Sequence, residues 1–426
     1  MEAHALVNST PKFLLVSLTV LQIVVLAGML HRDGPFDHVG MDYLTTWVGA
    51  SMIRDGDSHR LYDTRAQWEY ELPVIGHYDV HWNDRVMHPY LAPPPLAILS
   101  LPLSLLTPLA ALLVWMSLTV GAVLLAIRRL CKSFALPWGD VAPLVIGSMP
   151  LFALVMLGQA DGLLVLAFVV FLAQLRRGRE GRAGLALAVL AMKPQLLLAP
   201  IVYLLITGRR RAVVSVVAAS AVEAALSFAL IGWGGLQDAL AVSRRMAGPA
   251  GDAVINVPGM LNIRAAVTRS IPADMAFLQT ALIVALTAVI LMLTARLWRQ
   301  SDSREVTPIG AGLLCIVTVL TAFHAHYHSG VIALLGIALL AAGLRERGEA
   351  ILAHRLTMST LVAFSVVPFA LFLSNESTRR PATLGTIVLI AVWSWMVYGL
   401  ALRTRQVTSL TALSADTPAR HRRPEA

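Results

Sequence analysis

Charged residues are scarce in this sequence. Asp, Glu, Lys and Arg together make up 14% of the 426 residues, whereas an ordinary soluble domain contains about a quarter. Hydrophobic residues account for 57% of the chain. A very apolar soluble helical protein is the alternative, but it does not explain many nearly uncharged runs of membrane-spanning length. The shortage of charge therefore indicates a membrane protein.

Cysteine is also rare, and glycine-rich nucleotide-binding motifs are missing. The two cysteines, Cys131 and Cys315, fall near the inner side and within an apolar run, so we expect no disulfide on the outer side and no redox chemistry. The sequence has no G-x-G-x-x-G motif, no P-loop and no repeat of fixed period. No small-residue cleavage site follows the first apolar run, so we expect a retained helix rather than a signal peptide.

Long apolar runs recur along the chain. A helix needs about 20 apolar residues to cross a hydrocarbon layer of about 30 Å. We therefore predict an all-α integral membrane protein, a polytopic bundle of about twelve transmembrane helices, several of them short. The predicted spans lie near 12–30, 108–128, 141–157, 161–175, 183–192, 195–207, 212–232, 275–298, 307–322, 329–344, 354–373 and 382–402.

Basic residues set the predicted orientation, because cytoplasmic loops carry the excess of Lys and Arg. The clusters share one side only if Ala183–Leu205 is a hairpin of short helices that breaks at Pro194. The net charge of +9 is then a topology signal, and no motif indicates a nucleic-acid partner. The clusters are Arg128, Arg129 and Lys132; Arg176, Arg177, Arg179 and Arg182; Arg209, Arg210 and Arg211; Arg296 and Arg299; Arg345 and Arg347; and the tail from Arg403 to Arg423.

This topology divides the chain into a single membrane domain, residues 1–402, and a basic tail, 403–426, that we expect to be disordered. Two long outer loops, 31–107 and 233–272, carry most residues capable of chemistry. Ionisable groups at a membrane edge cost about 2.5–3.5 kcal/mol on insertion scales, so we interpret them as functional. The outer polar residues are Asp42, His59, Asp63, His77, His81, Asp84, His88, Gln159, Asp161, Lys193, Gln195, Asn256, Asn262, Arg264, His324, His326 and His328.

Asp42 begins a predicted interfacial helix in the first outer loop. Tyr43, Trp47, Ala50 and Ile53 recur at helical spacing, which is typical of an amphipathic helix. A carboxylate at such a position either caps the helix or acts in catalysis. The residue type leaves both roles open.

The three late histidines and Lys193 each fit two roles. His324, His326 and His328 could bind a metal, but no paired carboxylate lies beside them, so we favour contact with an anionic substrate. Lys193 stands alone in the run 183–207. It either reaches back to the membrane interface or places a positive charge against a phosphate.

Six segments, taken in order, resemble a known family. They resemble the polyprenyl-phosphate-sugar-dependent glycosyltransferases of the GT-C class, and most closely glycosyltransferase family 87, with its mycobacterial mannosyl- and arabinofuranosyltransferases. The resemblance covers roughly residues 12–345, and Asp161 stands where Asn is commoner in the motif. The segments are Asp42 to Gly56 with Leu61-Tyr62-Asp63, His88 to Pro95, Gly158 to Gly162, Arg176 to Arg179, Lys193-Pro194-Gln195, and the His-rich segment ending a late span.

The resemblance implies a metal-independent, inverting transfer of mannose or another sugar to a lipid or polysaccharide acceptor, without a cofactor. It implies that Asp42 is the general base. It further implies an enzyme of the bacterial plasma membrane, in contact with membrane lipids, with its site facing the periplasm. The implied ligands of the donor phosphate are Lys193, His324, His328 and Arg264, and the implied contacts to sugar or acceptor are His88, Tyr90, Gln159, Asp161, Gln195, Asn262 and His326.

Two other functions fit a polytopic membrane protein. A secondary transporter or flippase for an anionic lipid or solute would use buried Lys and His along its pathway, but it predicts corresponding broken helices in two halves of the chain. A structural membrane subunit would leave the outer polar residues without a role. The sequence does not specify the sugar, the acceptor, the linkage or the oligomeric state.

Overall fold

The computed structural model describes residues 2–80, 88–247, 257–300, 305–374 and 379–415. Within these ranges the chain is helical apart from turns and the isolated bridges Pro35 to Val39 and Met260 to His326, which confirms the predicted all-α class. The α-helices are α1 (Glu2–Asp33), α2 (Met41–Arg54), α3 (Thr64–Tyr78), α4 (Pro94–Ser100), α5 (Pro108–Phe134), α6 (Trp138–Ile146), α7 (Met149–Leu157), α8 (Asp161–Arg176), α9 (Glu180–Ala188), α10 (Leu198–Ile206), α11 (Arg210–Ala247), α12 (Ile263–Ser270), α13 (Ala276–Gln300), α14 (Pro308–Thr321), α15 (Gly330–Glu346), α16 (Ala350–Leu361), α17 (Val367–Leu373) and α18 (Arg379–Ala415). Short 3-10 or π turns are η1 (Ser58–Arg60), η2 (Leu101–Leu105), η3 (Val189–Met192), η4 (Pro194–Leu196), η6 (Val257–Gly259), η7 (Ala273–Met275), η8 (Tyr327–Ser329) and η9 (Val362–Val366).

The protein is a multi-pass membrane protein, but the predicted count of twelve spans is not confirmed. Among the described residues, seven helical segments are long and apolar enough to cross a membrane, and an eighth forms if α6 and α7, bent by 55°, make one span. Helices α8 and α14 have 16 and 14 residues, which at 1.5 Å per residue are shorter than the hydrocarbon layer. The seven segments are Leu15–Asp33, Pro108–Phe134, Arg210–Arg245, Ala273–Arg299, Tyr327–Glu346, Ala350–Leu373 and Arg380–Gly399.

The core of the bundle lies around α14 and α15. Residues 330–344 of α15 are all buried, and α14 approaches closely where Gly312 meets Gly336. A Cβ atom on Gly312 would lie 2.7 Å from the Gly336 carbonyl oxygen, so this crossing needs glycine. Outer helices instead expose large apolar side chains, such as Leu226 at 62% and Phe277 at 89%. Lipid chains rather than water are the natural surroundings of such a surface.

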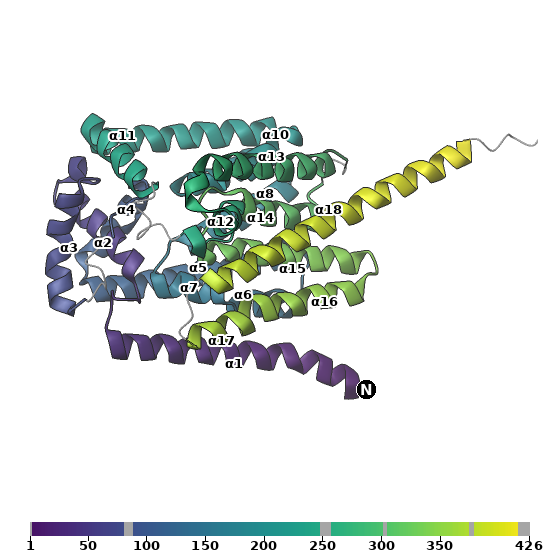
Figure 1. Ribbon diagram of the computed structural model, residues 1–426, viewed down its shortest axis with the longest axis horizontal. Helices are drawn as coiled ribbons and strands as arrows, with labels where there is room; N and C mark the ends of the chain where they lie inside the picture. The colour runs from purple at the N-terminus through teal and green to yellow at the C-terminus, as the bar shows by residue number, and fades with distance from the viewer. Residues whose placement is uncertain (1, 81–87, 248–256, 301–304, 375–378, 416–426) are drawn as a thin grey trace, which may run out of the picture.

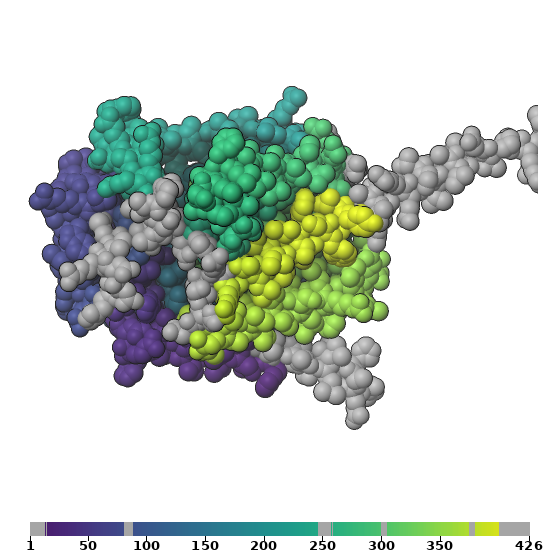
Figure 2. Space-filling view, in the orientation of Figure 1, coloured from purple at the N-terminus to yellow at the C-terminus, as the bar shows by residue number. Residues whose placement is uncertain are grey.

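The two ends of the bundle differ in what they carry. The long helices run in roughly one direction, with α2, α3 and α4 at one end and the turn between α15 and α16 at the other (Figure 1). Helix α18 crosses the visible face of the molecule obliquely (Figure 2). The outer-loop helices are therefore separated from the basic α15–α16 turn, as the charge pattern predicts.

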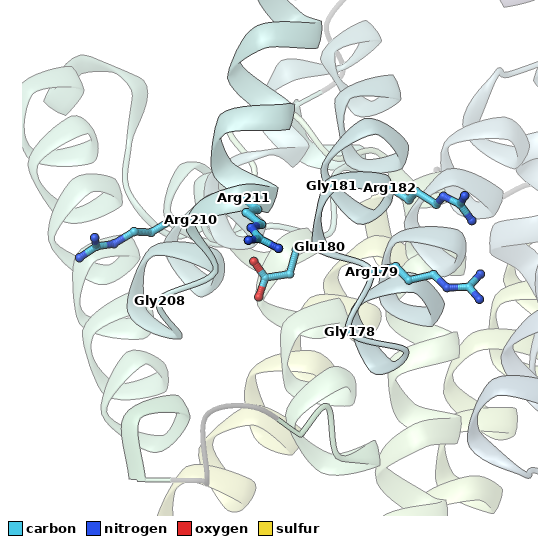
Figure 3. Close-up of a pocket in the computed structure, with 8 residues that line it drawn as sticks. All are labelled: Gly178, Arg179, Glu180, Gly181, Arg182, Gly208, Arg210 and Arg211. Atoms are coloured by element: carbon cyan, nitrogen blue, oxygen red, sulfur yellow. The ribbon is translucent and has the colours of Figure 1, made fainter.

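A hairpin breaks at Lys193, as predicted. Helix α9 and turn η3 lead to Lys193, whose φ of −136° and ψ of 76° interrupt the helix, and η4 and α10 lead back. The turns before α9 and before α11 line one pocket of about 770 Å³, and Glu180 lies among its arginines (Figure 3). Arg179 and Arg182 point to one side of the pocket and Arg210 to the other. We interpret this pocket as the meeting point of two basic loops.

Two predicted loop boundaries differ from the structure. Helix α11 bends at Gly232, with φ 67°, and continues to Ala247, so the second long loop begins as helix. Helix α18 is described as far as Ala415, beyond the predicted start of the tail at 403. Of the predicted outer residues, His81, Asp84 and Asn256 lie outside the described residues.

Candidate active site

A tight turn between α7 and α8 brings Gln159 to Asp42. Gly158 ends α7 with φ 72°, and a Cβ atom there would lie 2.6 Å from Cβ of Tyr43, so glycine permits the close approach of α2. The Gly40 amide donates to the Met156 carbonyl at 2.6 Å, and the Trp115 indole donates to the Gly158 carbonyl at 2.9 Å. These contacts join segments that are far apart in the sequence.

Asp42 does not cap its helix. The N-cap residue of α2 is Gly40, in the left-handed conformation and without a side-chain capping bond. The Asp42 carboxylate instead accepts a hydrogen bond from Nε2 of Gln159. Burial raises the pKa of Asp42, while the bond from Gln159 and the charge of Lys193 act in the opposite direction. Of the two roles that the sequence leaves open, capping is therefore not the one that this geometry shows.

The Lys193 ammonium has three polar neighbours inside the protein. Its Nζ lies 3.0 Å from Oε1 of Gln159, 2.5 Å from Oδ2 of Asp161 and 3.4 Å from Nε2 of His328. The side chain is still 21% exposed, so Lys193 does not reach to the membrane interface and remains accessible. Because an ammonium only donates, Gln159 must direct its oxygen to Lys193 and its amide hydrogens to Asp42. Gln159 therefore links the carboxylate to the lysine.

Asp161, a predicted contact to sugar or acceptor, lies against Lys193. Its side chain is fully buried, with Oδ2 on Lys193 and Oδ1 accepting from Oγ of Ser329 at 2.8 Å. Both oxygens are engaged within the protein, because burial of a carboxylate requires compensating partners. This geometry suits the positioning of Lys193 better than contact with a sugar hydroxyl. Ser329 was missed in the sequence, although it directly follows the His-rich segment.

The three histidines lie together in the turn between α14 and α15. The ring centroids of His324 and His326 are 4.4 Å apart, and those of His326 and His328 are 5.7 Å apart. Burial is the main reason that the pKa values of His324 and His326 fall, to about 2 and about 4. Both rings are therefore neutral near pH 7 and can donate or accept hydrogen bonds. Among the described residues, no three His, Cys, Asp or Glu side chains form a group that could hold a metal ion.

The remaining predicted residues near this cluster mainly shape its walls. Gln195 donates to the His324 carbonyl at 3.2 Å. Asn262 is fully buried, caps α12 through the Ala265 amide and donates to the Ala322 carbonyl at 2.8 Å, so its amide supports the backbone beside the histidines. The Arg264 guanidinium stacks over Phe323, with 4.1 Å from Cζ to the ring centroid.

Arg264 also lines an apolar groove, which we call the Arg264 groove, with a volume of about 340 Å³. Its walls come from α10, α13 and the end of α14, so a single cation stands against an otherwise apolar surface. The lining residues are Leu198, Arg264, Ile283, Val284, Thr287, Ala288, Leu291, Leu320, Thr321, Ala322 and Phe323.

Two further predicted contacts, His88 and Tyr90, lie in the segment that leads to the Pro-rich turn before α4. The Tyr90 hydroxyl donates to the Pro93 carbonyl at 2.7 Å and accepts from the Ala97 amide at 3.1 Å. This buried ring also packs against α2 at Gly49, so its polar atom supports the Pro-rich turn. His88 is partly buried, and burial lowers its pKa.

Comparison with known proteins identifies a family. The family model described as glycosyltransferase family 87 matches residues 90–323, more than half of the chain. This range includes the turn at Gln159, the broken hairpin at Lys193 and the cap of α12 at Asn262. No curated protein and no solved structure matches the chain.

Proposed function

Because the chain belongs to glycosyltransferase family 87, we propose that this membrane glycosyltransferase takes its sugar from a polyprenyl phosphate and passes it to an acceptor hydroxyl. The observation that carries the proposal is the hydrogen-bonded series from Asp42 through Gln159 to Lys193. The side-chain amide of Gln159 thus has the Asp42 carboxylate on one side and the Lys193 ammonium on the other. A glycosyl transfer from a phosphate needs these two groups, one for the incoming hydroxyl and one for the leaving group.

Asp42 takes the role of general base in this scheme. The acceptor oxygen attacks the anomeric carbon as the bond from that carbon to the phosphate oxygen breaks. The hydroxyl proton passes to Asp42, and the bonding electron pair leaves with the polyprenyl phosphate. Attack opposite the leaving group inverts the anomeric configuration. The raised pKa of Asp42 suits a group that must accept a proton during transfer.

Lys193 receives the charge that develops on the leaving phosphate. Two of its donors are bound to Gln159 and Asp161, so the third, which faces His328 at 3.4 Å, is the one that a phosphate takes. Asp161 holds the ammonium in place during this exchange. His324, which is neutral, and Arg264 add donors on the same side. Protein cations and donors can stabilise a monophosphate without a metal.

A transfer assay with a panel of sugar donors tests the proposed function. Full-length protein in reconstituted vesicles is incubated with radiolabelled polyprenyl phosphates that carry mannose, arabinofuranose or glucose, together with lipid and polysaccharide acceptors. We expect transfer or slow release of sugar from at least one donor, and loss of this activity in the Asp42→Asn variant. If nucleotide sugars serve as donors and no polyprenyl phosphate sugar does, the proposed donor class is wrong.

Gln159 should set the pH dependence of transfer. The Asp42 carboxylate must be deprotonated to act as a base, so the rate falls as the pH drops through its pKa. The Gln159 hydrogen bond lowers that pKa, and its loss in Gln159→Ala should move the acid limb of the kcat/KM profile to higher pH. An acid limb that stays at the parental pH would show that Gln159 does not position the base. Gln22→Ala, in α1, is the control.

Transfer should persist in EDTA. In the proposed scheme Lys193 and Arg264 provide the positive charge that a divalent ion provides in many phosphate-transfer sites. The measurement is the initial rate after chelation and after addition of Mg²⁺ or Mn²⁺. Abolition by the chelator with recovery on adding a divalent ion would instead assign a metal to this site.

We also propose that the site faces the outside of a bacterial plasma membrane. The basic α15–α16 turn then faces the cytoplasm, where Arg and Lys are enriched. In a variant with Cys131 and Cys315 replaced, a cysteine introduced at His77 should react with an impermeant maleimide in intact cells. A cysteine at Arg179, which is exposed on a basic turn, should react only after permeabilisation. Labelling of position 179 in intact cells would reverse this orientation.

A further inference from the structure

The pocket between the turns before α9 and α11, which we call the basic pocket, lies at the end of the hairpin away from Lys193. Helix α9 and turn η3 lead from the pocket to Lys193, and η4 and α10 lead back to it. The 16 residues of α8 span about 24 Å between Asp161 and the first of these turns, at 1.5 Å per residue. The pocket volume of about 770 Å³ is within the range of about 300–1,000 Å³ usual for ligand pockets. The basic pocket is therefore separate from the candidate active site.

The basic pocket carries an excess of positive charge. Its charged lining residues are Arg179, Arg182, Arg210, Arg211 and Glu180. The four arginines are exposed, and none of them has an ion-pair partner within the described residues. Glu180 pairs instead with the buried Arg209, at 3.9 Å. Figure 3 shows Arg211 and Glu180 between the two turns and the other three arginines at the edges of the pocket.

Two helices begin at the basic pocket and run side by side. A Cβ atom on Gly184 of α9 would overlap the Ala212 carbonyl oxygen of α11 and lie 2.6 Å from Cβ of Ser215, so the first turns of the two helices are in close contact. The positive ends of both helix dipoles therefore meet at the pocket. The N-cap of α9, Arg179, makes no side-chain capping bond, which leaves the amides of the first turn for an anion.

Exposed apolar side chains follow the arginines along both helices. On α9, Arg182 is followed at helical spacing by Leu185, which is 58% exposed. On α11, Arg210 is followed by Val214 and Val217, which are 66% and 60% exposed. Both helices run from the basic turns into the membrane, so these apolar residues lie deeper than the arginines. A phospholipid has the same order, with a charged headgroup at the surface and acyl chains below it.

We propose that the basic pocket binds the headgroup of an anionic phospholipid, whose acyl chains lie along the exposed faces of α9 and α11. Basic pockets between membrane helices are typical sites for such headgroups. A guanidinium binds phosphate through two parallel hydrogen bonds, and the helix N-termini add backbone donors. A soluble phosphate compound has no apolar part to cover the neighbouring side chains. The Asp42 to Lys193 network takes no part in this binding, so the inference goes beyond the proposed function.

Photolabelling in nanodiscs tests the site. Full-length protein is placed in nanodiscs of phosphatidylethanolamine with a small fraction of phosphatidylglycerol that carries a photoreactive diazirine on one acyl chain. Labelled peptides should map to α9 and to the first turns of α11. The same diazirine on phosphatidylethanolamine should label these peptides about tenfold less, because that headgroup has no net charge. Both faces of a nanodisc offer the same lipids, so the result does not depend on the proposed orientation.

Two triple variants remove equal charge from two basic clusters. The pocket variant carries Arg179→Gln, Arg182→Gln and Arg210→Gln. It should reduce phosphatidylglycerol labelling by about tenfold, because each basic residue at a membrane surface adds to the attraction of anionic lipids. The control variant carries Arg128→Gln, Arg129→Gln and Lys132→Gln. These three residues are exposed near the C-terminal end of α5, where the helix dipole disfavours an anion, so labelling of α9 and α11 should be unchanged.

A fourth substitution acts in the opposite direction. Glu180→Gln removes the carboxylate from the pocket lining and should raise phosphatidylglycerol labelling, and it tests the site even if the pocket variant does not fold. Excess inorganic phosphate should leave the labelling unchanged.

Four results would each overturn the proposal: an equal loss in the two triple variants, equal labelling by the two lipid probes, displacement by inorganic phosphate, or labelling that does not rise in Glu180→Gln. The first would show that overall charge attracts the lipid, and the third would assign the pocket to a soluble anion. None of these measurements depends on turnover, so a failed transfer assay would refute the proposed function separately.

Discussion

Replacement of Asp42 with asparagine is expected to slow transfer by about 10²- to 10⁴-fold, the usual contribution of a positioned general base. Asparagine has nearly the same size but does not accept the hydroxyl proton. The α2 N-cap is Gly40, so no capping bond is lost with the carboxylate. The measurement is kcat for the donor that the panel identifies, with the melting temperature of the purified variant recorded alongside.

Asp55→Asn provides the matched control for this prediction. Asp55 follows the other end of α2, is 41% exposed and pairs with the neighbouring Arg54. Its replacement should leave kcat at the parental value, because an exposed ion pair contributes little. Near-parental turnover in a folded Asp42→Asn enzyme would remove Asp42 from the reaction and leave the Gln159 contact as a structural one.

Replacement of Lys193 with alanine is expected to lower transfer by about 10²- to 10³-fold, as loss of a charge-stabilising donor does elsewhere. It should also destabilise the fold, because the buried Asp161 loses its main partner, and breaking a buried pair costs up to about 3–5 kcal/mol. Lys193→Arg should recover part of the activity, since it keeps the charge but places it differently. The measurements are donor KM, kcat and thermal unfolding.

A double variant separates the two effects. Lys193→Ala with Asp161→Asn removes both charges of the pair, so the melting temperature should recover toward the parental value. Activity should not recover with it, because the phosphate still lacks its cation. If activity returns together with stability, Lys193 acts through folding alone and the phosphate must be bound by other groups.

Several features of this site could be predicted because they depend on nearby residues. Pro194 follows an isolated lysine in an apolar run, which is enough to predict a break at Lys193. The separation of basic turns from the outer loop follows from the rule for cytoplasmic charge. The place of Asp42 at the start of α2 marks it as a candidate, yet the residue type leaves capping and catalysis open.

Other features depend on distant partners and could not be predicted. Ser329 and Asp161 are hydrogen-bonded across 168 residues, and no local pattern marks that contact. Asn262 and Tyr90 have residue types suited to sugar binding, but their polar atoms support backbone turns.

The sequence by itself determined that this protein is an all-α membrane protein with a broken hairpin at Lys193, because hydropathy, proline and charge act over a few neighbouring residues. The tertiary structure alone decided that Asp42 binds Gln159 rather than capping α2, and that Asp161 is buried against Lys193. These outcomes depend on which helices pack together, as at Gly158 against Tyr43. Burial and hydrogen-bond pairing are set by such contacts and are not encoded in local residue order.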